Sequence, residues 1–100
     1  MSQKALFITV KDLKAKSIIS GNTDGDKLIH FIEVAQDIHI QNYLGGRLYD
    51  KMQALVISNE IDLAINSDYK LLRDDYIKPM LTWFTQSEYF PFAMFKIDNG

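Results

Sequence analysis

The sequence of 100 residues has no cysteine, only two prolines and no long apolar run. Without cysteine, disulfide bonds, thiolate metal sites and cysteine nucleophiles are excluded. The apolar run at residues 5–10 is far too short for a signal peptide or a membrane span. We therefore expect one domain that folds in a cytoplasm, since chains of this length seldom divide in two.

Positive charge is also sparse outside the start of the chain. The formal net charge is −2, and the first twenty residues hold four lysines against one aspartate, so they carry +3 and the remainder −5. Four lysines without interleaved arginine or aromatic residues are a poor footprint for nucleic acid. Opposite charges at the two ends suit head-to-tail contact between identical subunits instead. Such contact would also add burial to a chain that buries only about 60–65% of its surface alone.

Helical periodicity is what the sequence does have. Turn residues near positions 20–22, 45–46, 58–59 and 66–67 separate four helical patterns, at about residues 9–16, 25–44, 47–57 and from 66 onward. The sequence therefore predicts an all-α fold, a small bundle of about four helices. Residues 1–20 form an N-terminal arm and short helix, and residues 21–100 form the helical core. A short strand at residues 6–10 is the alternative for the arm, because the segment is apolar and ends in β-branched residues.

The predicted helices differ in how their apolar residues are arranged. In the helix predicted at residues 25–44, the polar residues form one stripe, and the remaining surface is apolar enough to contact several neighbouring elements. The polar stripe contains Asp26, His30, Glu33, Asp37 and Gln41. The third is amphipathic, with Gln53 on its polar side. In the last predicted helix, the spacing of three or four residues predicts a buried, aromatic-rich stripe of Tyr69, Leu72, Tyr76, Met80 and Trp83.

Pro79 lies inside the last predicted helix. Its ring nitrogen cannot donate to the Asp75 carbonyl, so we expect a kink or a division there. The segment that follows, residues 90–97, has three phenylalanines and a single charge, and we expect it to be buried in the domain's own core or against another subunit. His39, on the apolar side of the second helix, is expected to be a buried or interface residue. The predicted partner-binding residues are His39, Trp83, Phe90, Phe92 and Phe95.

One loop resembles a calcium site. Asn22, Asp24 and Asp26 stand at positions one, three and five of an EF-hand-like loop, and Glu33 stands at position twelve. Lys27 occupies the position that needs glycine, and the chain has no second such loop. The simpler interpretation is that these residues cap a helix and line its solvated face, so no metal site is predicted and these four remain weak candidates.

No constellation in the sequence supports catalysis. Asp74 and Asp75 would diverge by about 100° on a helix, so they cannot form a converged carboxylate pair. The stripe that contains His30 and Glu33 lacks a second cluster to meet it, and no serine has a nucleophile-elbow context. We expect neither an enzyme nor a cofactor.

Two stretches of the sequence resemble one known family. Residues 35–52, AQDIHIQNYLGGRLYDKM, are similar to the helix, glycine turn and helix of tailed-bacteriophage head-tail connector proteins, those of crAss-like phages especially. Residues 74–83, DDYIKPMLTW, followed by EYFPF at 88–92, resemble the same family's proline-kinked helix. Together they cover most of residues 22–99.

The resemblance implies a structural virion protein without catalytic activity. Such subunits assemble into a ring at the head-tail interface of the virion, between the portal and the next tail or ring protein. The ring extends the channel through which DNA passes without sequence-specific binding, and the subunits are made in the host bacterial cytoplasm. These relatives usually continue beyond the position of Gly100, which implies a C-terminal truncation here. A calcium-binding module and a generic helical protein-interaction module are the alternatives.

Overall fold

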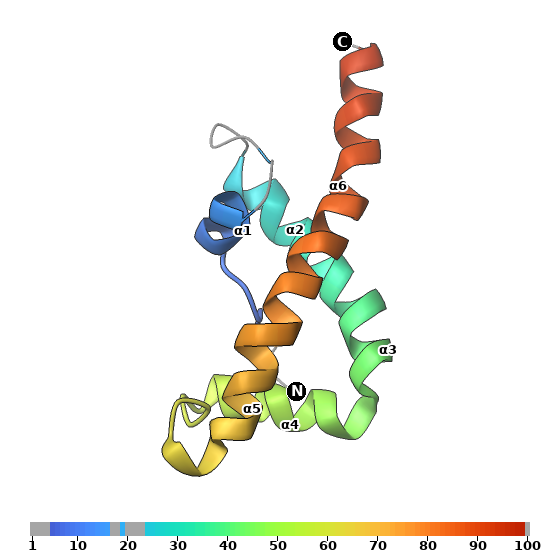
Figure 1. Cartoon of the computed structure of the whole chain (residues 1–100). Helices are drawn as coiled ribbons and strands as arrows, with labels where there is room; N and C mark the ends of the chain where they lie inside the picture. Colours follow the sequence, from blue (N-terminus) through green and yellow to red (C-terminus); the bar gives the residue numbers. More distant parts are fainter. Residues whose placement is uncertain (1–4, 17–18, 20–23, 100) are drawn as a thin grey trace.

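The computed structural model describes residues 5–16, 19 and 24–99, with side chains up to residue 93. The described chain forms four continuous helical rods and contains no strand, which confirms the predicted all-α bundle (Figure 1). In order, its elements are α1 (Val10–Lys16), α2 (Gly25–Ala35), η1 (Gln36–Ile40), α3 (Gln41–Leu44), α4 (Gly46–Ile57), η2 (Ala64–Asn66), α5 (Ser67–Leu71), η3 (Leu72–Ile77) and α6 (Lys78–Asn99).

The α2 and α6 rods form the main helix pair, and α4 runs across one end of it (Figure 1). The molecule measures 50 × 25 × 22 Å. Its length comes from α6, whose C-terminal half runs beyond the rest of the chain (Figure 1). Within the described part, no helix is both long and apolar enough to cross a membrane.

The core forms where the N-terminal arm, α2, α4 and α6 meet. Its side chains are aliphatic with two aromatic rings, and Phe7 meets Tyr49 edge-on at a ring-centre distance of 5.9 Å. The most deeply buried members include Ile8, Leu13, Leu28, Ile32, Ile40, Met52, Ile77 and Leu81. The arm therefore supplies part of the core, although its described residues before α1, 5–9, have no regular secondary structure.

Two glutamines hold the arm in place. Gln36 Oε1 accepts the Phe7 N–H at 2.9 Å, and Gln36 Nε2 donates to the Ala5 carbonyl at 2.8 Å. Gln53 binds the same residue twice, accepting the Ala5 N–H and donating to its carbonyl, both at 2.7 Å. The strand alternative for residues 6–10 is therefore wrong: the chain bends at Phe7 and Ile8, the Phe7 N–H bonds to a side-chain amide instead of a neighbouring strand, and Val10 already begins α1. Gln53, expected on the polar side of its helix, is instead buried.

The helix ends follow the local signals in the sequence. Thr9 and Asp12 form a capping box, in which Thr9 Oγ1 accepts the Asp12 N–H at 3.0 Å and Asp12 Oδ2 accepts the Thr9 N–H at 3.3 Å. Gly45, with φ +80° and ψ 159°, separates α3 from α4. Asn59 adopts a left-handed φ of 61° after α4, and the Glu60 N–H reaches back to the Leu55 carbonyl at 3.0 Å, so α4 ends in a Schellman motif.

Two π-helical segments interrupt the long rods. In η3, directly before Pro79, the Lys78 N–H bonds to the Arg73 carbonyl, five residues back. The α-helical ladder restarts at Lys78, so Pro79 stands in the first turn of α6, where a missing donor costs little. The division expected at Pro79 therefore takes the form of a π turn inside one continuous rod.

The π turn also changes which face of α6 is buried. A π turn contains one residue more than an α turn, so every face after it moves on by one residue. The predicted stripe placed Tyr76, Met80 and Trp83 in the core, whereas Ile77 and Leu81 are buried there. Tyr76 and Trp83 face solvent, so the prediction that they are buried is wrong.

Candidate interaction surface

A groove with an exposed tryptophan lies between the arm with α1 and the rod formed by η3 and α6. Ile8, Asp12 and Lys16 line one side, and Lys78, Pro79 and Trp83 line the other. Its volume is about 520 Å³, within the about 300–1,000 Å³ of typical ligand pockets. Trp83 is 66% exposed, so its indole forms an open wall of this groove. We call this feature the Trp83 groove.

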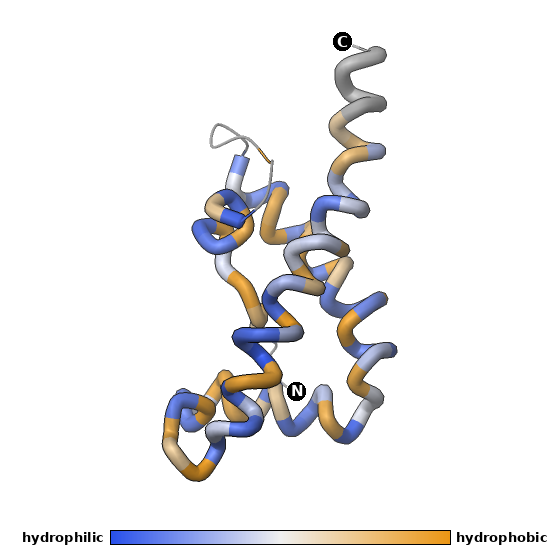
Figure 2. The backbone as a smooth tube through the Cα atoms, in the orientation of Figure 1, coloured by the Kyte–Doolittle hydropathy of each residue, from blue (hydrophilic) through white to orange (hydrophobic). Residues whose placement is uncertain are grey.

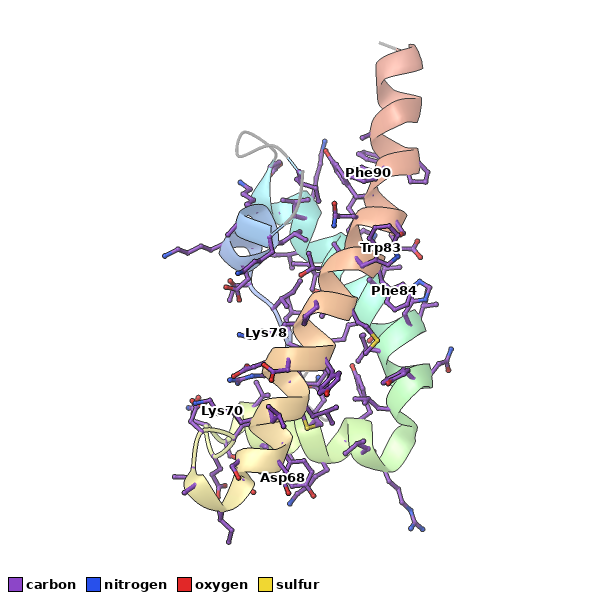
Figure 3. All side chains as sticks on the ribbon, viewed as in Figure 1. Asp68, Lys70, Lys78, Trp83, Phe84 and Phe90 are labelled. Carbon is purple, nitrogen blue, oxygen red and sulfur yellow. The ribbon has the colours of Figure 1, made fainter. Side chains whose placement is uncertain are left out.

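Lys78 joins the two sides of the Trp83 groove electrostatically. Its Nζ lies 4.0 Å from Asp12 Oδ2 on α1 and 3.7 Å from Asp74 Oδ1 on η3 (Figure 3 labels Lys78 and Trp83). Arg73 Nε also donates to Asp74 Oδ1 at 2.7 Å, and this hydrogen bond lowers the pKa of Asp74 below its usual value. Both carboxylates of the groove are therefore balanced by cations.

A second exposed apolar feature lies between α4 and α5. Leu63 is half-exposed and Ile65 is 88% exposed, and we call this pair the apolar tip. Figure 2 shows hydrophobic residues in this loop, at the end of the molecule opposite to the C-terminal end of α6. The two side chains form a small apolar surface that is available for contact with another molecule.

Of the predicted partner-binding residues, His39 is paired within the chain. Its ring stacks on Phe84 at a centroid distance of 4.1 Å and an interplanar angle of 9°, and its Nε2 lies 3.0 Å from Glu88 Oε1. Two side chains of α6 thus contact the face and one nitrogen of the His39 ring, which belongs to η1. About a third of each polar side chain stays exposed, at the surface where η1 and α6 meet.

Two aromatic residues in the C-terminal half of α6, Tyr89 and Phe92, lie against α2. Phe31 meets Tyr89 and Phe92 at ring-centre distances of 5.4 Å each, and Lys27 Nζ lies 5.8 Å from the centre of the Phe92 ring. Phe90 is half-buried, and Phe92 remains partly exposed. The Phe95 side chain lies outside the described residues. Trp83 is thus not brought together with these rings but lies in the groove.

The residues of the calcium-like loop do not converge. Asp24 Oδ1 accepts the Asp26 N–H at 3.0 Å and so caps α2, while Asp26 and Glu33 are exposed on that helix. Asn22 lies outside the described residues. Over residues 5–16, 19 and 24–99, no group of three or more histidine, aspartate or glutamate side chains could hold a metal ion.

Comparison with other proteins adds no relative. No family model matches the sequence, and no curated protein and no solved structure is significantly similar to it.

The sequence interpretation missed the groove, the tip and the two arm-binding glutamines. The groove depends on how the arm and α6 pack, which no local pattern reports. A signal for the tip was present, because Leu63 and Ile65 stand among turn residues where neither neighbouring helix can bury them. The sequence gives only a weak sign that the two glutamines are buried, namely the apolar residues near each of them.

Proposed function

We propose that this chain is a structural virion protein, a head-tail connector subunit that joins identical copies in a ring between the portal and the tail. The observation that carries the proposal is the separation of its exposed apolar sites. The Trp83 groove lies beside α1, and the apolar tip lies in the loop between α4 and α5. A ring subunit needs two different sites, one for each neighbour, because each contact joins unlike surfaces.

Two further features support this proposal. The end of α6 runs beyond the body (Figure 1), and Phe92 on this helix stays partly exposed, which suits contact with a portal or with the next ring. The resemblance of residues 35–52 and 74–92 to connector proteins points to the same role. The sequence holds 11 basic residues against 13 acidic ones, so DNA passing through such a ring would meet no net positive charge.

The proposal is tested on virus particles. Virions from cells that produce this chain are purified and analysed by peptide mass spectrometry, and an antibody raised against the chain is located on them by gold labelling. We expect the chain in the particles and the label at the junction of head and tail. Absence from purified virions, or labelling elsewhere on them, would refute the proposal.

The Trp83 groove favours a second candidate function, a helical module that binds a segment of a different protein. A groove of about 520 Å³ with one exposed aromatic wall can accept a short apolar segment. This candidate predicts that the chain stays monomeric and binds its partner one to one. Native mass spectrometry of the purified chain separates it from the ring proposal.

A further inference from the structure

The apolar tip is held rigid although it is exposed. The buried Ile61 anchors the loop to the core, and Asn66 Nδ2 donates to the Glu60 carbonyl at 2.8 Å across it. Asp62 is paired with Lys70 and Arg73 of the following rod, each at 3.5 Å. A loop held in this way loses little conformational entropy on binding, so it is preorganised to enter a second surface.

The Trp83 groove offers such a surface. Trp83 and Pro79 supply an apolar wall, and Ile8 closes the groove from the arm side. Aromatic residues that stand in a pocket are the usual centres of protein contacts. The tip lies at the end of the molecule where α5 begins, away from α1 and its side of the groove, so it does not fill the groove of its own chain (Figure 1).

The charges around the two features are complementary. Residues 58–68, which include the tip, hold three carboxylates and no basic residue. The α1 side of the groove carries three lysines against one aspartate, and Lys16 lines the groove itself. The carboxylates within the groove are already balanced by Lys78 and Arg73. An acidic apolar segment is therefore favoured there over a basic one.

We infer that the occupant of the Trp83 groove is the apolar tip of a second copy of this chain, with Ile65 and Leu63 against Trp83 and Pro79. The contact joins two unlike surfaces, so the copy that contributes its tip keeps a free groove and the copy that contributes its groove keeps a free tip. Further copies can bind at these free surfaces, and repeated contacts close a ring or extend a filament. The inference rests on the proposed function, for which it names the residues that join neighbouring subunits.

Two variants that introduce a charge test the contact. Ile65→Lys replaces the more exposed aliphatic side chain of the tip by a cation, and Trp83→Asp replaces the aromatic wall by an anion that repels an acidic tip. Both positions are largely exposed, so circular dichroism and the melting temperature should match the wild type. We expect wild-type chains to assemble with concentration in sedimentation velocity, and either variant alone to associate about 30-fold more weakly, the usual effect of losing a hot spot.

Mixing the two variants gives the sharpest result. The Trp83→Asp chain keeps an intact tip and the Ile65→Lys chain keeps an intact groove, so the mixture should form one-to-one dimers at concentrations at which neither variant alone associates. Tyr43→Ala, at an exposed aromatic residue on α3, is the matched control and should assemble as the wild type does. If either first variant does not fold, Ile65→Ser or Trp83→Ala replaces it.

Fluorescence gives an independent readout, because Trp83 is the only tryptophan of the chain. Docking should shift its emission to shorter wavelength and protect it from acrylamide as concentration rises, in the wild type but not in Ile65→Lys. A wild type that stays monomeric, a variant mixture without dimers, or a Tyr43→Ala chain that loses assembly would overturn the inference. In each of these cases the proposed function would still stand if the chain were detected at the head-tail junction. Conversely, if the chain assembled through this contact but were absent from virions, the proposed function would be refuted and the contact would not.

Discussion

Gln36 accepts a hydrogen bond from the backbone of Phe7 at 2.9 Å, although 29 positions separate the two residues. The same amide donates to the Ala5 carbonyl and, at 3.1 Å, to the Tyr49 hydroxyl. One buried side chain thus joins the arm, the α2 rod and α4. A buried amide with this many partners is costly to remove, because its partners are left without hydrogen bonds.

Gln36→Leu is expected to lower the free energy of unfolding by roughly 2–3 kcal/mol, since leucine can neither accept from Phe7 nor donate to Ala5. Urea denaturation at pH 7 measures the loss. Gln41→Leu, at an exposed position of the same rod, serves as the control and should change stability by less than about 0.5 kcal/mol. Equal stability of the two variants would show that the arm does not depend on Gln36.

Gly45 and Gly46 form a matched pair of positions. A Cβ at either would meet no atom within 4 Å, but Gly45 has φ +80° and ψ 159°, a region open essentially to glycine alone. Gly45→Ala should therefore destabilise the protein by about 1–3 kcal/mol through backbone strain. Gly46→Ala, in the first turn of α4, should be neutral or stabilising. The melting temperatures of both variants test this expectation. An unchanged melting temperature for Gly45→Ala would contradict the positive φ at this turn.

The Asp74 carboxylate should make stability depend on pH. The hydrogen bond from Arg73 lowers its pKa in the folded state, so the stabilisation is complete above the pKa of the unfolded chain, about 3.9, and is lost as pH falls through the lower folded value. Asp74→Asn should cost up to about 1 kcal/mol at pH 7, because the pair is partly exposed, and less at pH 3. Urea titrations at both pH values test this. The control is Asp75→Asn, which removes the same formal charge at the exposed neighbouring residue.

Pro91 interrupts the hydrogen bonds of α6 where the helix leaves the body. As the second proline of the rod it stands in the helix interior and cannot donate to the Ser87 carbonyl. Pro91→Ala should restore that donor and slow amide hydrogen exchange in the C-terminal half of α6. Exchange in α4 should not change, which separates a local effect from a global one. Faster or unchanged exchange after residue 91 would contradict the expectation.

The helix ends were predictable because each depends on a few neighbouring residues. The capping box at Thr9 and the glycine turn at Gly45 are local signals, and both helix boundaries lie within a residue of their predicted positions. The buried face of α6 was not predictable in the same way. A strict α-helical period places Trp83 in the core, whereas the π turn before Pro79 moves the buried face to Ile77 and Leu81.

The candidate site was predicted only in part, since it depends on tertiary packing. Trp83 was expected at a partner surface as well as in a core stripe, and it is exposed. The groove beside it forms because the arm is fixed by Gln36 and Gln53, two residues far away in the sequence. No periodicity relates those glutamines to Ala5, so neither the arm's position nor the groove could follow from a local pattern.

The binding of the arm also has a consequence for the order of events during synthesis. Ala5 and Phe7 leave the ribosome before the side-chain amides that bind them, which belong to positions 36 and 53. Until α4 has been made, the Phe7 and Ile8 side chains have no complete core to enter. The arm therefore reaches its final position only after the two later helices have been synthesised.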